Sequence, residues 1–296
     1  MRDAFLDSNY GAMTNILVTG ATGTIGRETL RALEALGEKP RLALRDPSRA
    51  PDGRSAVALD WSDPATFGAA LAGIERVFLL TPFVEDSETP ARAFLEAAVH
   101  AKVKFVLKLS AAGVAEDAPF SAARQHARVE RALAESGIGH AILRPTFFMD
   151  NVLTFQRDAI LATGAFHGAS GDQPVVYVSS RDVGEVAAQV LRAPAQHGGR
   201  TYELTGGVGV RDSELATLLA SAAGKPVVYV DHSVEEYAAS MTATGAPGWV
   251  AEAMSMLEAV KRNGWATTPS RAIDELLGRA PETYADFIAR HAARLR

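Results

Sequence analysis

A glycine-rich turn near the start of the chain restricts the fold more than any other feature. Residues 20–26 read GATGTIG, between an apolar run at 15–19 and a segment with leucines at helical spacing at 27–36. A strand, a tight glycine turn and a helix in this order open a doubly wound, Rossmann-type α/β fold. The helix start offers free N–H groups to phosphate, so the turn predicts a dinucleotide site. The alternative is a glycine-rich turn without a ligand.

Strand and helix patterns alternate through the first half of the chain. Asp63-Pro64 and Thr89-Pro90 each predict a helix start, because Asp and Thr cap helices and Pro suits the first helical position. A further helix is predicted at 122–135. The predicted strands are 15–19, 41–44, 55–59, 76–80, 104–109 and 141–144. This alternation predicts a parallel sheet with helices on both faces.

The second half of the chain is less regular. It predicts strands at 175–178 and 202–204, a helix with Asp182 as its N-cap, and a loop at 242–248. The predicted helices are 183–191, 213–223, 250–261 and 282–295. We expect an N-terminal extension (1–14), an NAD(P)-binding domain (15–152, to which 174–205 returns) and a smaller, mostly helical C-terminal substrate lobe (153–173 and 206–296).

Composition narrows the class of protein. The 296 residues carry 30 Lys and Arg against 35 Asp and Glu, a net charge of −5 that argues against a nucleic-acid binder. There is no cysteine, which excludes disulfides, thiolate metal sites and cysteine nucleophiles. The histidines show no metal-ligand spacing, so we predict no metal. No stretch suits a membrane span, and residues 1–15 do not resemble a secretion signal, so we expect a cytoplasmic protein. A homodimer is an open expectation.

The glycine turn and the strand ends that follow it predict the contacts with the cofactor. The predicted turn contacts are Gly20, Thr22, Gly23, Thr24, Ile25 and Gly26. Arg45 follows the second strand and suits a 2′-phosphate, which favours NADP(H) over NAD(H). The alternative is a solvated Arg45, with Asp46 on the ribose of NAD(H).

Two further strand ends reach the same edge of the predicted sheet. Asp60 follows the third strand and could accept a hydrogen bond from the adenine amine, or could be a simple turn residue. Thr81 and Pro82 follow the fourth strand, where ligands bind in folds of this type, and Phe83 comes next as a wall for cofactor or substrate. Packing in the core is the alternative for Phe83.

Several segments together resemble one family. They are GATGTIG, LDWSDP (59–64), FLLTP (78–82), KLSAAG (108–113), HARVERALAESGI (126–138), LRPTFFMDN (143–151) and GRAPETYADFIARHA (278–292). In combination they are similar to the NmrA-like atypical short-chain dehydrogenase/reductase family. The resemblance implies an extended Rossmann fold, a small substrate lobe and NAD(P)H binding. The family includes reductases of quinones, dyes and imines, and regulators that bind the dinucleotide without turnover.

The chain departs from common short-chain dehydrogenases at one motif. Those enzymes carry a Ser and a Tyr-x-x-x-Lys pair, in which the Tyr protonates the product oxygen. Ser110 matches the Ser, but the Tyr-x-x-x-Lys register falls at 122–126, where there is no Tyr and His126 stands in place of the Lys. The usual carbonyl chemistry is therefore not implied. Reduction of a quinone, iminium, enone or dye needs only a hydride donor and a shaped pocket.

The predicted catalytic residues are Lys108, Ser110 and His126. His126 could hydrogen-bond the nicotinamide ribose or relay a proton near neutral pH, and the alternative is a structural histidine. Lys108 and Ser110 share a face near the carboxyl end of the fifth strand. Lys108 could bind the ribose as part of the cofactor site, or could be a lysine that extends its amine to solvent.

The segment after the sixth strand completes the predicted site. By the resemblance, Pro145, Thr146 and Phe147 border the nicotinamide, and Phe147 walls the hydride-transfer site. The predicted substrate residues are Phe83, Phe147, Phe148 and Asn151, and packing in the core is the alternative for Phe148. The sequence thus favours an NADPH-dependent oxidoreductase acting on a small organic molecule. The alternative is an NADP(H)-sensing regulator that acts through a protein partner, which the missing Tyr favours.

Overall fold

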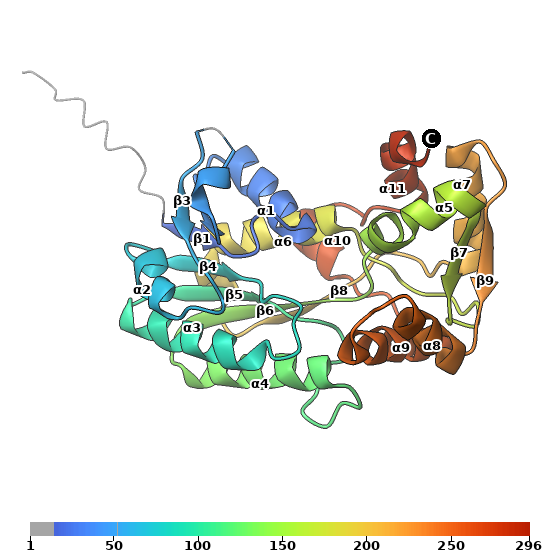
Figure 1. Ribbon diagram of the computed structural model, residues 1–296. Coiled ribbons are helices and arrows are strands. Elements are labelled where there is room, and N and C mark those ends of the chain that lie inside the picture. Colours follow the sequence, from blue (N-terminus) through green and yellow to red (C-terminus); the bar gives the residue numbers. More distant parts are fainter. Residues whose placement is uncertain (1–14, 52) are drawn as a thin grey trace, which may run out of the picture.

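Seven parallel strands form the central sheet of the computed structural model, which describes residues 15–51 and 53–296 (Figure 1). The strands are β1 (Ile16–Val18), β2 (Arg41–Leu44), β3 (Ala56–Ala58), β4 (Arg76–Leu79), β5 (Phe105–Leu109), β6 (Gly139–Pro145) and β8 (Thr201–Leu204). Their order is β3-β2-β1-β4-β5-β6-β8, so the chain reverses direction across the sheet between β1 and β4. The predicted Rossmann-type fold is confirmed, and this reversal marks the edge where such folds bind ligands.

Helices cover both faces of this sheet. The first layer contains α1 (Thr24–Ala35), α6 (Ser180–Arg192) and α10 (Ala272–Leu277), and the second contains α2 (Ala65–Leu71), α3 (Glu88–His100) and α4 (Ser121–Glu135). Strand β1 shows why its sequence is uniformly apolar. Ile16 and Val18 pack with the first layer and Leu17 packs with the second, so every side chain of the strand is buried.

A second group of elements lies beside the sheet (Figure 1). It holds a two-stranded parallel sheet, β7 (Ala165–Gly168) and β9 (Val228–Asp231). Its helices are α5 (Arg157–Thr163), α7 (Asp212–Ala223), α8 (Val234–Ala243), α9 (Gly248–Arg262) and α11 (Tyr284–His291). The short turns of the chain are η1 (Pro47–Arg49), η2 (Val152–Gln156, a π-helix), η3 (Pro194–Gln196) and η4 (Ala292–Leu295). Much of this group shares a separate buried cluster, which includes Phe166, Leu219 and Phe287.

Two local predictions for the second half are wrong. Residues 175–178 form no continuous strand, because the backbone N–H groups of Val175, Val176 and Val178 donate to three different segments, at Val210, Ala266 and Phe147. Asp182 is not the N-cap of its helix. Ser179 is, and its side chain accepts a hydrogen bond from the Asp182 N–H.

Other predictions shift or lie outside the structure. The last predicted helix divides into α11 and η4. The patterns gave no sign of β7, β9, α8 or α10. The predicted extension at 1–14 lies outside the described residues. Within the described part of the chain, no helix has both the length and the apolar character of a membrane span.

Candidate active site

The glycine turn after β1 is built to leave backbone N–H groups free. Gly20 has a φ of +61° and accepts a hydrogen bond from Gly23 N at 2.9 Å. Gly23 caps α1 without a side-chain hydrogen bond, and no acidic residue stands in the first turn of that helix. Within residues 15–51 and 53–296, the positive end of α1 thus has no side-chain cap and no acidic residue in its first turn, which suits an anion such as a pyrophosphate.

A cavity of about 640 Å³ opens over this turn at the carboxyl edge of the sheet. We call it the cofactor cavity. The predicted cofactor residues that line it are Gly20, Thr22, Gly23, Thr24, Ile25, Arg45, Thr81 and Pro82. The sequence missed Trp61, Asp150, Thr154 and Phe155, which also line it and which carry no local signal of a ligand.

Arg45 extends into solvent at the end of β2, with 85% of its side chain exposed. Its Nε lies 4.0 Å from Asp60 Oδ2. The Asp60 carboxylate accepts from Ser62 N at 2.9 Å and from Ser62 Oγ at 2.7 Å. Asp46 caps η1 in the same way, through Ser48 N and Ser48 Oγ at 3.0 and 2.7 Å. These hydrogen bonds lower the pKa of both carboxyl groups and hold them locally, whereas the Arg45 guanidinium keeps most of its surface exposed beside the cofactor cavity.

Lys108 and His126 form a buried pair beneath this edge. Lys108 is fully buried on β5, and its Nζ lies 2.9 Å from His126 Nδ1 and 3.0 Å from Leu109 O. Burial lowers the pKa of Lys108 to about 7, and burial together with Lys108 lowers the pKa of His126 to about 3. The imidazole is therefore neutral near pH 7, and Lys108 is the member of the pair that titrates there. His126 lies within α4, one turn past its start.

Ser110 belongs to a separate network. Its hydroxyl donates to Glu130 Oε1, and the buried Glu130 also accepts from Arg144 Nη2 at 2.6 Å and Nε at 3.2 Å. Ser110 directly follows β5, Glu130 lies on α4 and Arg144 lies on β6, so the network ties these parts of the fold together. Ser110 thus has a structural partner for its proton in this structure.

The remaining predicted residues take different positions. The cofactor cavity is not lined by six of the predicted cofactor residues, which are Gly26, Asp60, Lys108, Pro145, Thr146 and Phe147. Thr146 Oγ1 donates to Val176 O at 2.7 Å, which fixes the chain after β6. Phe83 lines neither cavity described here. It is 60% exposed, with its ring centroid 5.1 Å from that of Trp249.

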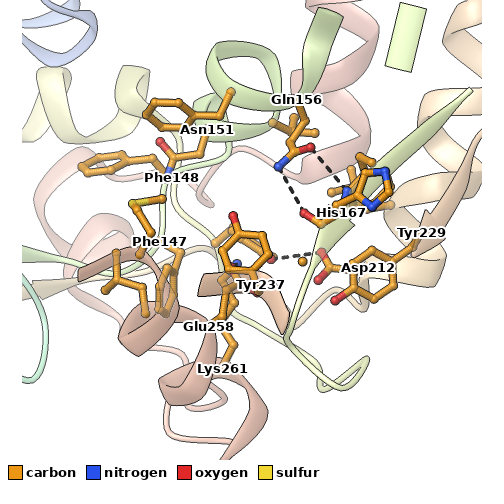
Figure 2. A pocket seen from close by; sticks show the side chains of 18 of the residues that line it. Phe147, Phe148, Asn151, Gln156, His167, Asp212, Tyr229, Tyr237, Glu258 and Lys261 are labelled. Atoms are coloured by element: carbon orange, nitrogen blue, oxygen red, sulfur yellow. Dashed lines mark hydrogen bonds and ion pairs between the residues drawn. The ribbon is translucent and has the colours of Figure 1, made fainter. Parts of the chain in front are cut away.

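A second, smaller cavity of about 80 Å³ lies between the chain after β6 and the second group of elements (Figure 2). We call it the aromatic cavity. The predicted substrate residues Phe147, Phe148 and Asn151 line it. Its polar and aromatic wall also includes Tyr177, Tyr229, Tyr237, Asp212, Glu258 and Lys261. Phe148, Asn151 and Phe155 line both cavities, so the two meet at the segment around the π-helical turn η2, a type of turn frequent at functional sites.

The buried Lys108 should make the stability of the protein depend on pH. Its folded pKa of about 7 lies below its unfolded value of 10.5, so between these values the unfolded chain binds more protons. The free energy of unfolding should therefore rise with pH across this window, by up to a few kcal/mol. We expect Lys108→Met to remove this slope, as measured by urea unfolding at several pH values.

The exposed Lys104, paired with Glu75, provides the control. Lys104→Met should keep the slope of the wild type. Equal slopes in the wild type and Lys108→Met would contradict the burial argument.

The turn, the strand reversal and the cofactor cavity together define a dinucleotide-binding protein of the Rossmann type. Residues 20–194 match the NAD(P)H-binding family, and the chain belongs to this family. It is 34% identical over 282 residues to the NAD(P)H azoreductase of Xenophilus azovorans, which covers 94% of this chain and 98% of that protein. It is 29% identical to quinone oxidoreductase 2 of Escherichia coli (strain K12), which covers 93% and 97%.

Solved structures agree with these relatives. The crystal structure of the E. coli NADPH-dependent quinone oxidoreductase, complexed with NADPH, matches with a TM-score of 0.83 at 28% identity and covers 93% of this chain and 99% of that one. The triphenylmethane reductase of Citrobacter sp. matches with a TM-score of 0.82 at 24% identity, covering 93% and 99%. At this identity the second match shows a shared fold.

Proposed function

We propose that this chain is a cytoplasmic NADPH-dependent reductase that delivers a hydride to a small organic acceptor, such as a quinone, azo dye, imine or enone, without a Tyr-x-x-x-Lys pair. One observation carries the proposal. The cofactor cavity meets a partly enclosed aromatic cavity at the shared residues Phe148, Asn151 and Phe155. An open space beside the dinucleotide site is what an acceptor needs, whereas a sensor needs none. The azoreductase and quinone oxidoreductase relatives support the same chemistry.

The residues present fit NADPH. The free N–H groups at the start of α1 would bind the pyrophosphate, and Arg45 would bind the 2′-phosphate. Thr81 and Pro82 would lie along the dinucleotide, while Lys108 and His126 would hold the nicotinamide ribose from below. Pro145, Thr146 and Phe147 would border the nicotinamide. When bound, NADPH supplies the hydride.

The protein would position the hydride acceptor and exclude water from the cavity, and it would form no covalent bond to the acceptor. Phe147, Tyr177 and Tyr237 line the aromatic cavity, and the last two are buried. These rings would exclude water and hold a flat acceptor against the reacting face. The chemistry then depends on how closely donor and acceptor are placed.

Arg45→Ala should weaken NADPH binding by about 10- to 100-fold and leave NADH binding unchanged, because only NADPH carries the phosphate that a guanidinium binds with charge-assisted hydrogen bonds. Fluorescence titration of both dinucleotides measures this. Arg54→Ala is a matched control, since Arg54 pairs with Glu34 outside the cavity. An equal loss for both dinucleotides would remove Arg45 from the phosphate site.

The function itself is tested by NADPH oxidation with quinones, azo dyes, imines and enones, with NADH in parallel. Rapid oxidation with one acceptor class, and a preference for NADPH, is the expected result. A dinucleotide-sensing regulator is the second candidate, because no Tyr stands at 122–126. Tight NADPH binding without oxidation by any acceptor, together with capture of a specific protein partner, would favour the regulator.

A further inference from the structure

Lys261 is the only lysine or arginine among the described residues that line the aromatic cavity. It lies on α9, and 13% of its side chain is exposed. Its Nζ lies 5.2 Å from the ring centroid of Phe147 and 5.9 Å from that of Tyr177. In Figure 2, Lys261 and Glu258 project from α9 near Phe147 and Tyr237. The ammonium group therefore stands close to the ring that would wall the nicotinamide.

The acidic groups of the cavity are already occupied by partners within the protein. Asp212 accepts from Ser170 Oγ at 2.7 Å and from Tyr177 OH at 3.3 Å. Glu258 accepts from Ala169 N at 2.9 Å through Oε2 and from Lys261 Nζ at 2.5 Å through Oε1. Neither carboxylate therefore needs a hydrogen bond from the molecule that accepts the hydride.

The ammonium group, by contrast, has donors to spare. A lysine has three N–H donors. Among the described residues, Lys261 uses one of them, in its hydrogen bond to Glu258. The aromatic faces of Phe147 and Tyr177 stabilise the charge without taking up a strong hydrogen bond. Lys261 can therefore donate to a ligand in the cavity while Glu258 holds it in place.

The predicted catalytic residues do not reach this cavity, and the tyrosines in its wall are poor proton donors. Lys108, Ser110 and His126 do not line the aromatic cavity. The Tyr177 hydroxyl donates to Asp212, and burial raises the pKa of Tyr177 well above its ordinary value. Burial also raises the pKa of Tyr229 well above its ordinary value and raises the pKa of Tyr237 to about 12. A tyrosine in this wall is thus a poor source of a proton.

We propose that Lys261 binds and protonates the carbonyl oxygen of the acceptor, an inference that rests on the reductase function proposed above. An enone or quinone that gains a hydride forms a new bond to hydrogen at one end of its conjugated system. The displaced electron pair collects on the carbonyl oxygen at the other end. There an N–H bond of Lys261 breaks as the O–H bond forms, and the resulting amine regains its proton from water. Lys261 thus takes the proton-donating role that the Tyr has in common short-chain dehydrogenases.

This assignment also selects among acceptors. Quinones and enones develop negative charge on oxygen, which an adjacent ammonium stabilises. Iminium and triphenylmethane-type cations bring a positive charge next to the ammonium, which opposes their binding. They become neutral when they gain the hydride, so no negative charge develops for the ammonium to stabilise. The acceptor class is therefore a neutral, conjugated carbonyl compound.

The site can be tested without the dinucleotide by using 4-nitrophenol, whose phenolate absorbs visible light. We expect the wild type to bind the phenolate about tenfold more tightly than Lys261→Met does, because an opposite charge at close range favours the ionised probe. Lys225→Met is the control, since Lys225 donates to Leu161 O and does not line the cavity. Thermal unfolding of each variant checks that the fold is intact.

Steady-state turnover is the second measurement. Lys261→Met should lower kcat with a quinone by about 100-fold, leave NADPH affinity within about threefold, and spare a cationic dye. Unchanged phenolate binding in Lys261→Met, or an equal loss of turnover with the quinone and the cationic dye, would overturn the role of Lys261. If no acceptor is reduced by the wild type, the reductase function fails, but the phenolate experiment still decides whether Lys261 binds an oxyanion.

Discussion

Gly26→Ala should raise the dissociation constant for NADPH by about 100-fold or more, because the new methyl group displaces the backbone that holds the pyrophosphate. A Cβ at position 26 would lie 2.2 Å from Gly20 O and 2.9 Å from Ala21 Cα. Both are backbone atoms, so no side chain can move aside. Either the turn or the start of α1 must shift, and the free N–H groups shift with it.

The same substitution should also destabilise the fold by about 1–3 kcal/mol, the usual effect of overpacking. Gly68→Ala is the matched control, since Gly68 lies within α2 and a Cβ there meets nothing within 4 Å. It should leave NADPH binding unchanged and stabilise its helix slightly. Dinucleotide titration and urea unfolding measure both effects. Normal NADPH binding by Gly26→Ala would show that the turn does not hold the pyrophosphate.

Asp182→Ala should lower the free energy of unfolding by about 3 kcal/mol, because it removes one partner of a buried ion pair and leaves a backbone N–H without an acceptor. Asp182 is fully buried on α6. It accepts from Arg279 Nη2 at 2.6 Å and from Glu282 N at 2.7 Å. It therefore binds the segment before α11 to α6, a helix that covers one face of the central sheet.

The partial exposure of Arg279 places this value at the lower end of the range for buried pairs. Asp158→Ala is the control, since Asp158 is 94% exposed and pairs with Arg157 at the surface. It should change stability little. Urea unfolding followed by circular dichroism measures both variants. A loss in Asp182→Ala no larger than in the control would mean that the segment is held by its apolar contacts instead.

The first half of the fold could be predicted because each of its signals is local. The apolar run at 15–19, the glycine turn and the strand ends at Arg45 and Thr81 need only neighbouring residues to be interpreted. The turn and both strand ends line the cofactor cavity. The pairing of Lys108 with His126 is a less local feature. The sequence predicted that both residues lie near the nicotinamide. Only the packing of α4 on β5 shows that His126 is buried against Lys108, which lowers its pKa and keeps the imidazole neutral.

The aromatic cavity could not be predicted in the same way. Glu258 and Lys261 stand three residues apart on an amphipathic helix, a spacing that usually indicates a solvated ion pair. Their burial depends on Phe147 and Tyr177, which come from distant segments. Strands β7 and β9 were missed for a related reason. Each has only four residues, which is too short for an alternating pattern to stand out, and β9 has no fully buried position.

The path of the chain also limits how recombination between related genes could transfer an acceptor pocket from one protein to another. The chain leaves the central sheet after β6, returns for α6 and β8, and then leaves it again, apart from the short helix α10. The acceptor side is thus encoded in two separate stretches, with an essential helix and strand of the sheet between them. A single crossover between two related genes would join halves that never evolved together in one cavity wall. Recombination that transfers a whole acceptor pocket needs two exchanges, so gradual substitution is the easier route to a new acceptor.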